Sequence, residues 1–288
     1  MYRKSCRKSN FIWRNKQLLY LLPSLIGVLV LWLIPFGIVC VRSVQHAINK
    51  QFCGLENYRI ILENQAFLLA VKNTIRVSVV CIPVLMACSL FLAVLIQKSR
   101  FLNLLKSSLL FPVAVPTATV VLIWRLLFHK NGICNTLLAQ IGFEKVGWLT
   151  SGTAFFVLVF SYLWKNLGYT IVLWVAGLNS IPESILEAAR MDGASERVCF
   201  FRVVCPNLRP VFFTITILSF LNSFKVFREA YLVAGAYPDQ SMYLLQHLFN
   251  NWYTNLDLDK MAAAAVLLAV VLGGVTFALQ KVWDCYEE

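Results

Sequence analysis

The chain has 288 residues, of which 59% are hydrophobic and only 14% are charged. Soluble globular chains average about 45–50% apolar and about 25% charged residues. A disordered, collagen-like or disulfide-scaffold chain is therefore excluded, and a water-soluble enzyme is disfavoured. The composition predicts an all-α integral membrane protein, because six spans of about 20 residues each fit within the apolar content.

A basic tail opens the chain and contributes to the net charge of +12, since no acidic residue precedes Glu56. The tail, residues 1–16, contains Arg3, Lys4, Arg7, Lys8, Arg14 and Lys16. Basic residues directly before a long apolar run hold that end of a membrane protein in the cytoplasm. The sequence has no helix-turn-helix, zinc-finger or RNA-binding signature. We therefore expect a cytoplasmic tail and no nucleic-acid partner.

Six apolar runs have the length of a membrane-spanning helix. The first, residues 17–41, is longer than the core of a signal peptide and is followed by no small-residue cleavage site, so we expect it to remain as a span. The others are 71–96, 104–128, 153–178, 211–234 and 261–282. Three prolines inside these runs each remove a helical hydrogen bond and can bend or break the helix, namely Pro83, Pro112 and Pro116.

The distribution of Lys and Arg predicts the orientation. With the N-terminus inside, the cytoplasmic segments hold 14 of these residues and the external segments hold 7. Both termini, and the loop 179–210 between spans four and five, are then cytoplasmic. The expected organisation is a tail (1–16), a first span with its external loop (17–66), a core of spans two to six (67–283) and a short cytoplasmic tail (284–288). We expect a multi-pass protein of the cytoplasmic membrane.

Cysteine and histidine give no sign of a metal or redox centre. The nine Cys include no C-x-x-C pair, and only Cys53 and Cys134 fall in predicted external loops, where they either form a bridge or stay free. His46, His129 and His247 fall in or beside external segments without a carboxylate at metal-binding spacing, so we expect them to be solvated or interfacial. We predict no metal, no cofactor and no catalytic residue in this chain.

The loop 179–210 begins with helix signals. Ser180 and Glu183 have the spacing of a capping box, and Pro182 suits the first turn of a helix. A helix is therefore predicted to run from here to about Met191. Gly193 can supply the left-handed conformation that ends it.

A second short helix is predicted over 195–204, broken by Pro206 and Pro210. The loop is thus expected to be two short helices at a sharp angle rather than a flexible connection. The turn between them offers small side chains and two carboxylates, which suit docking of a partner: Glu187, Ala188, Ala189, Asp192, Gly193 and Ala194.

These residues carry a family resemblance. Glu187-Ala188-Ala189, Asp192-Gly193-Ala194, Phe200 and Pro206-Asn207-Leu208-Arg209-Pro210 resemble the EAA loop of binding-protein-dependent ABC importer permeases, a pattern that extends over 24 residues. Flanking stretches resemble the carbohydrate-uptake subgroup: Gly54-Leu55-Glu56-Asn57-Tyr58, Lys72-Asn73-Thr74, Trp164-Lys165-Asn166-Leu167-Gly168 and the segment 176–182. The likeness covers nearly the whole chain and implies a type I importer fold.

The resemblance implies that the loop inserts into a cleft of a cytoplasmic ATPase subunit. The implied coupling residues are Glu187, Ala188, Ala189, Arg190, Asp192, Gly193 and Ala194. The chain has no Walker sequence, so ATP hydrolysis is expected in a partner and the chain itself is expected not to be an enzyme. Relatives of this type pair with a second, non-identical permease subunit, two cytoplasmic ATPase subunits and an extracellular or periplasmic substrate-binding protein.

One stretch departs from the subgroup. Many members have a Gly-rich G-G-G-P turn after the fifth span, whereas this chain has Ala234-Gly235-Ala236-Tyr237-Pro238-Asp239. Since the implied docking site of the binding protein is near this external turn, recognition of that protein is expected to differ.

Polar residues within the apolar runs indicate a pathway, because an unpaired charge in a bilayer is costly unless it reaches a water-filled cavity. The charged ones are Lys165, Lys225, Arg228 and Glu229. The candidate substrate pathway consists of Trp164, Asn166, Tyr169, Asn222, Ser223 and Phe224. Two structural alternatives stay open: Lys225 and Glu229 pair at a spacing of four residues, and Asn222 and Ser223 bond a neighbouring helix.

The leading hypothesis is a translocation subunit of an ABC importer for a carbohydrate or related polyol. The same machinery with another cargo, such as an amino acid, peptide, polyamine or phosphate ester, is the alternative. A membrane-embedded enzyme would need a cluster of acids, bases or metal ligands at the interface, and the external acids are scattered. An ion-driven carrier would need carboxylates within spans, and Glu229 is the single candidate.

Overall fold

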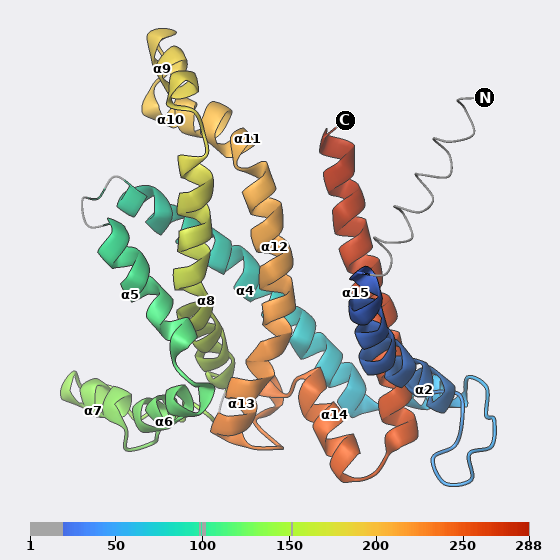
Figure 1. The fold of residues 1–288 in the computed structure, drawn as a ribbon. Helices are drawn as coiled ribbons and strands as arrows, with labels where there is room; N and C mark the ends of the chain where they lie inside the picture. Colours follow the sequence, from blue (N-terminus) through green and yellow to red (C-terminus); the bar gives the residue numbers. More distant parts are fainter. Residues whose placement is uncertain (1–19, 98, 100–101, 151, 288) are drawn as a thin grey trace, which may run out of the picture. The chain divides into compact units, whose positions relative to one another are not determined.

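The computed structural model describes residues 20–97, 99, 102–150 and 152–287 (Figure 1). These residues form helices and connecting segments without a strand, and one isolated antiparallel bridge joins Gln45 to Phe52. The prediction of an all-α membrane protein is confirmed. The predicted basic tail 1–16 lies outside the described residues. The chain divides into two compact units, residues 1–64 with 252–277 and residues 65–251 with 278–288.

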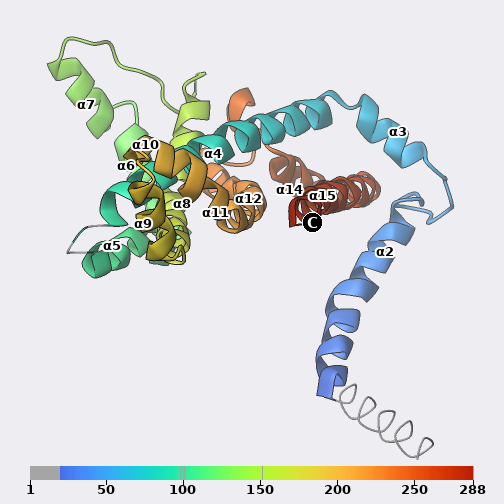
Figure 2. The same ribbon diagram turned by 90° about the horizontal axis from the view of Figure 1, so that it is seen from above.

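The first unit contains the helical segment Tyr20–Arg42, the helix α3 (Glu56–Glu63) and residues 258–277 of the helix α15 (Leu258–Glu287). Tyr20–Arg42 includes a π-helical turn η1 (Leu29–Leu33) followed by α2 (Ile34–Arg42), drawn in dark blue in Figure 2. No side chain in its apolar window is buried within the chain. Such a surface suits contact with lipid or with another subunit.

The second unit is built around α4 (Gln65–Gln97), α8 (Ala154–Asn179) and α12 (Arg209–Ser223), which pack against one another. Buried polar side chains cross between these helices. The Trp174 indole of α8 donates to the Ser89 hydroxyl of α4 at 2.9 Å, and the Tyr162 hydroxyl donates to the Ser219 carbonyl of α12 at 2.8 Å. These bonds satisfy groups that would otherwise be costly to bury in an apolar core.

The helix α5 (Leu102–Ala114) packs closely on α8 at one glycine. A Cβ at Gly168 would lie 1.7 Å from the Leu109 carbonyl oxygen. Only glycine permits two backbones to approach this closely, so the α5–α8 contact depends on this position.

Five helices among the described residues are long and apolar enough to cross a membrane, and six if one bent pair is taken as a single span. The five are Tyr20–Arg42, Gln65–Gln97, Ala154–Asn179, Arg209–Ala234 and Leu258–Cys285. The bent pair corresponds to the third predicted span. Each predicted span therefore has a helical counterpart. The predicted number of six spans holds if the bent pair counts as one span.

The third predicted span, 104–128, is broken at one of the prolines that were expected to bend or break a helix. It consists of Ser107–Ala114 and Thr117–Gln140, bent by 92°. The break falls at Pro116, which has no N–H and holds an extended ψ of 136° as the residue before α6 (Thr117–Phe128). The helix α7 (Ile133–Gln140) follows. In contrast, α4 continues through Pro83.

The fifth span is interrupted as well. A 3-10 turn, η3 (Phe224–Val226), separates α12 from α13 (Phe227–Ala234). A short 3-10 stretch inside a helix often marks a hinge. After α13 come η4 (Gln240–Met242) and α14 (Leu245–Thr254), the second of which is labelled in Figure 1.

The loop after α8 contains the predicted first short helix, α9 (Glu183–Met191). The predicted capping box is wrong, because Ser180 ends α8 and its hydroxyl donates to the Gly177 carbonyl at 2.7 Å. The residue before α9 is Pro182, which has no side-chain cap. The predicted stop at Gly193 is confirmed, with a φ of +81°.

The second predicted helix is present as α10 (Glu196–Cys199) and the π-helical turn η2 (Phe200–Val204). Ser195 caps it by accepting a hydrogen bond from the Val198 N–H at 3.4 Å. The second predicted helix ends at Val204, as expected, and a new helical element begins around Pro206 and another around Pro210. Each proline lies in the first turn of the next helix, α11 (Cys205–Asn207) and α12, where a missing N–H costs no helical bond.

Candidate functional site

The candidate docking loop, residues 179–210, is packed on one side and open on the other. Ile181 and Leu208 are buried in the core, and Leu186 packs against the same cluster. No residue of α9 is fully buried, and the carboxylates of Glu187 and Asp192 are exposed. Figure 1 shows α9 and α10 beyond the ends of α8 and α12. A partner that presses on this loop would therefore act on a support continuous with two spans.

Hydrogen bonds fix the turn between α9 and α10. The Gly193 N–H donates to the Arg190 carbonyl and the Ala194 N–H to the Ala189 carbonyl, each at 3.0 Å. The Arg190 guanidinium donates to the Glu196 carboxylate at 3.2 Å and so joins the two helices. Of the predicted coupling residues, Ala189 and Ala194 are half-buried, and five are exposed: Glu187, Ala188, Arg190, Asp192 and Gly193.

A second candidate site is a cavity of about 390 Å³ between α5, α8 and the interrupted fifth span. Three of the predicted pathway residues, Asn166, Tyr169 and Asn222, line it. The other lining residues are Val113, Ser161, Tyr162, Lys165, Lys225, Val226, Arg228 and Glu229. The cavity is thus bordered by polar and charged groups inside apolar helices.

One ion pair joins the elements around the cavity. The Lys165 ammonium of α8 pairs with the Glu229 carboxylate of α13 and donates to the Thr117 hydroxyl of α6 at 3.0 Å. The alternative pair of Lys225 with Glu229 is therefore wrong. The Lys225 ammonium instead donates to the Asn222 side-chain carbonyl at 2.9 Å.

The charge of the cavity is not balanced within the described part of the chain. Lys165 and Glu229 neutralise each other, whereas Lys225 and Arg228 have no carboxylate partner among the described residues. Both cations lie within the interrupted apolar span Arg209–Ala234, where a charge requires water, a partner subunit or a ligand of opposite charge. The cavity therefore offers two positive charges to a solute.

Asn222 has both roles that the sequence left open, a bond to a neighbouring helix and a place along the candidate pathway. Its amide donates to the Tyr169 hydroxyl of α8 at 3.3 Å, which is a bond between helices. Both side chains also line the cavity, so the same bond defines part of its wall.

The other three predicted pathway residues lie away from this cavity. Trp164 packs edge-on against Trp124 at 5.3 Å, and Phe224 packs edge-on against Phe220 at 5.4 Å. Ser223 is buried, and its hydroxyl bonds the Ser78 hydroxyl of α4 at 2.9 Å. They are packing residues in this conformation, because side chains on adjacent helical positions point in different directions.

Both interruptions of the spans adjoin this site. The 3-10 turn contributes Lys225 and Val226 to the cavity wall, and Thr117, the first residue after the Pro116 break, bonds Lys165. The role of Thr117 was not predicted, although its position after a proline within an apolar run was a signal. Lys165 lies 14 residues before the end of α8, roughly 21 Å along the helix from the docking loop.

The histidines differ from the prediction in one case. His247 is fully buried rather than solvated, because α14 packs it among Phe227 and Tyr243. Its Nδ1 accepts a hydrogen bond from the Leu244 N–H at 3.1 Å. Burial lowers the pKa of His247 to about 4. His129 is exposed, as predicted.

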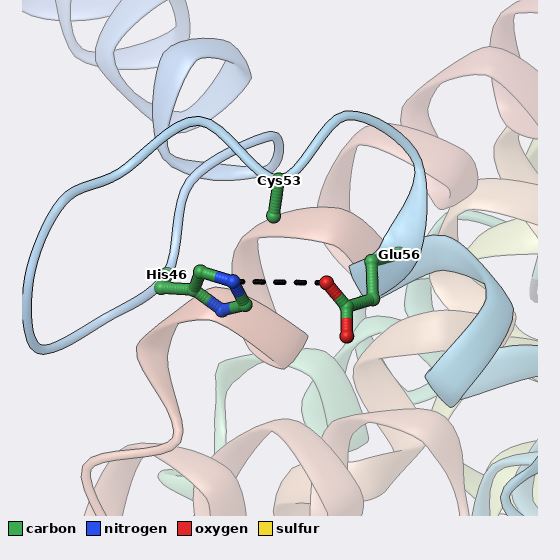
Figure 3. A group of neighbouring side chains, drawn as sticks. All are labelled: His46, Cys53 and Glu56. Atoms are coloured by element: carbon green, nitrogen blue, oxygen red, sulfur yellow. Dashed lines mark ion pairs between the residues drawn. The ribbon is translucent and has the colours of Figure 1, made fainter.

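Among the predicted external residues, Cys53 and Cys134 are both free thiols. His46 is half-buried and lies 3.6 Å from the Glu56 carboxylate (Figure 3). The sequence spacing gave no indication of this carboxylate, because the loop between α2 and α3 folds back on itself.

Comparison with known proteins identifies relatives along most of the chain. Residues 82–284 match the family described as binding-protein-dependent transport system inner membrane component. The sn-glycerol-3-phosphate transport system permease protein UgpA of Escherichia coli is 31% identical, over 92% of this chain and 95% of the relative. The trehalose/maltose transport system permease protein MalF of Thermococcus litoralis is also 31% identical, over 95% of this chain and 96% of the relative.

A solved structure shares the fold. A chain of a bacterial ABC transporter involved in the import of the acidic polysaccharide alginate superposes with a TM-score of 0.81, and the alignment covers 96% of this chain and 98% of that chain. Sequence identity is 19%, so this similarity shows a shared fold and nothing further.

Proposed function

Because the chain belongs to the family of binding-protein-dependent transport system inner membrane components, we propose that it is a translocation subunit of an ABC importer that moves a carbohydrate or related polyol across the cytoplasmic membrane. The observation that carries this proposal is the docking loop, which is exposed at its turn and packed at its base. A rigid loop of this kind transmits movement from a partner to the spans.

The energy source is an ATPase in a separate subunit. The loop residues 187–194 enter a cleft of that ATPase, and closure of two ATPase subunits moves two docked loops together. Alternating access follows as the spans rock about the site between them. Support comes from the exposed Glu187 and Asp192 carboxylates and from the absence of a Walker sequence in the chain.

The orientation places both termini and the docking loop in the cytoplasm. Support comes from the ratio of 14 to 7 in Lys and Arg between the two sides. The complete importer contains a second, non-identical permease subunit, two ATPase subunits and an extracellular or periplasmic substrate-binding protein. A second solved relative in fold, with a TM-score of 0.79, is a bacterial alginate ABC transporter in complex with alginate pentasaccharide-bound periplasmic protein.

The docking role is tested by Gly193→Asp and Glu187→Lys. A Cβ at Gly193 meets no atom within 4 Å, so the aspartate clashes with nothing in the core, and its only internal cost is the backbone strain of a positive φ. Gly142→Asp is the matched control, because Gly142 also has a positive φ (+88°) and open space around it. We expect both loop variants to insert normally but to lose co-purification with the ATPase and ATP-dependent uptake, whereas the control retains both. Normal uptake by either loop variant would refute the coupling role.

A phosphate ester or another anionic polyol is the second candidate cargo. It is favoured by Lys225 and Arg228, which face the cavity without a carboxylate partner among the described residues. Among the relatives, UgpA is named for sn-glycerol 3-phosphate and MalF for trehalose and maltose, so anionic and neutral cargoes both occur near this chain.

Uptake by proteoliposomes that contain the complete importer and its binding protein separates the two cargoes. With sn-glycerol 3-phosphate and maltose as probes, an anionic cargo predicts uptake of the phosphate ester and a loss of at least tenfold in Lys225→Gln/Arg228→Gln. A neutral cargo predicts uptake of maltose with little change in that variant. ATPase activity without cargo should persist in both cases and shows that the complex is assembled.

A further inference from the structure

The loop between α2 and α3 brings three metal-binding side chains together within the first unit (Figure 3). The His46 imidazole, the Cys53 thiol and the Glu56 carboxylate each offer one donor atom, and these atoms all lie within 4.8 Å of one another. We propose that the three side chains bind one zinc ion, with a fourth position taken by water. This site is separate from the docking loop and the cavity, and the proposal does not depend on the transported cargo.

Backbone hydrogen bonds hold the two sides of the loop together. The antiparallel bridge joins Gln45 to Phe52. The proposed ligands are the residues that follow these two in the sequence, His46 and Cys53. The Cys53 N–H donates to the Val44 carbonyl at 2.9 Å. His46 and Cys53 are seven positions apart in the sequence, and the loop folds back on itself so that the two residues come close together.

A buried amide fixes the third ligand. The Asn57 side chain donates to the carbonyls of Ser43 and Gln45, each at 3.0 Å, and only 1% of its surface is exposed. The Tyr58 hydroxyl donates to the Ser43 hydroxyl at 2.8 Å. These bonds attach the first turn of α3 to the loop, and Glu56 is the first residue of that helix.

The donor set and its spacing match zinc. Tetrahedral zinc with bonds of about 2.0–2.3 Å places its ligand atoms about 3.5 Å apart. The His46 Nε2 and Glu56 Oε2 atoms are 3.6 Å apart, so they fit as they stand, and the Cys53 sulfur lies within 4.8 Å of both. A thiolate ligand disfavours calcium and magnesium, which prefer oxygen donors alone.

The charge and accessibility of the site also suit the ion. A thiolate and a carboxylate together balance the two positive charges of zinc. His46 and Cys53 are half-buried and Glu56 is exposed, so an ion can enter from solvent and retain a water ligand. The alternative is a simple ion pair between His46 and Glu56 without a metal, which would leave the position of Cys53 unexplained. The test must distinguish this ion pair from a zinc site.

Cobalt(II) is the probe, because a cobalt–thiolate bond absorbs strongly in the near ultraviolet while zinc is spectroscopically silent. The full-length chain, purified in detergent and freed of metal with a chelator, should bind one cobalt per chain with this absorption, and zinc should displace it. Cys53→Ser should abolish the absorption, and His46→Ala and Glu56→Gln should each weaken zinc binding at least tenfold. Cys134→Ser is the matched control, since Cys134 is also a half-buried free thiol, and it should bind as the parent does.

A second measurement needs no variant. Zinc should slow the alkylation of Cys53 by a maleimide at least tenfold in the unmodified chain and leave Cys134 unaffected, as read by mass spectrometry of peptides. Equal zinc affinity in Cys53→Ser and the parent, or no protection of Cys53, would overturn the proposal and leave the ion pair of His46 with Glu56 as the whole of the interaction.

Discussion

The Lys165 ammonium pairs with the Glu229 carboxylate, which is 64 positions away in the sequence, and this pair lies at the wall of the cavity. Lys165 also bonds Thr117, so it connects the third, fourth and fifth spans of the expected six. Both interruptions of the spans adjoin the same cavity, through Thr117 at its Lys165 wall and through Lys225 and Val226 of the 3-10 turn. A movement of the spans at these interruptions would therefore change the surroundings of this ion pair.

Removal of the cation alone should destabilise the fold. Glu229 has only 6% of its side chain exposed, so Lys165→Met leaves a buried charge without a partner, which costs about 3–5 kcal/mol. The double variant Lys165→Met/Glu229→Gln should recover most of this loss, because no charge then remains unpaired. The thermal unfolding midpoint of the purified chain in detergent measures both changes. A double variant as unstable as the single one would show that the pair is not the cause.

Gly168→Ala should disrupt the contact of α5 with α8. The new Cβ would lie 1.7 Å from the Leu109 carbonyl oxygen, and a backbone atom cannot turn aside as a side chain can. We expect a loss of about 3 kcal/mol or more in the free energy of unfolding. Gly274→Ala is the control, since a Cβ there meets nothing within 4 Å and alanine favours a helix. Equal unfolding midpoints for the two variants would contradict the close approach.

The stability of the chain should fall as the pH falls from the pKa of His247 in the unfolded chain towards its lower pKa in the folded chain. Burial lowers its pKa from 6.5 to about 4 in the folded state, so the unfolded chain takes up the proton first. The contribution is complete above about pH 6.5 and is lost as the pH approaches 4. His247→Gln should flatten the dependence of the unfolding midpoint on pH in this interval. The exposed His129→Gln serves as control and should keep the slope of the parent.

The proposed orientation predicts opposite labelling of two exposed positions. Ser195 lies in the docking loop and Glu144 in a predicted external loop, and both side chains are exposed. A membrane-impermeant maleimide added to intact cells should label Glu144→Cys and not Ser195→Cys, beyond the background of the parent. Inverted vesicles should give the reverse. Labelling of Ser195→Cys in intact cells would place the loop outside and remove the proposed contact with the ATPase.

The sequence predicted the helices of the docking loop well and their local contacts less well. The helix α9, its stop at Gly193 and the helix after Ser195 follow from local signals, because glycine and serine act through their own backbone neighbourhood. The capping box failed because α8 continues to Asn179, so Ser180 serves the end of that helix and not the start of the next. A motif read without the length of the preceding helix cannot distinguish these two roles.

By itself, the sequence determined the class of protein, the number and approximate limits of the apolar runs, and the family, since length, hydropathy and the EAA spacing are properties of contiguous segments. The tertiary structure decided which polar groups meet. It paired Glu229 with Lys165 rather than with Lys225, separated Ser223 and Phe224 from the cavity that Asn222 lines, and brought Glu56 to His46. Such contacts join residues on different helices or across a folded loop, and the direction in which each side chain points depends on the packing of all of them.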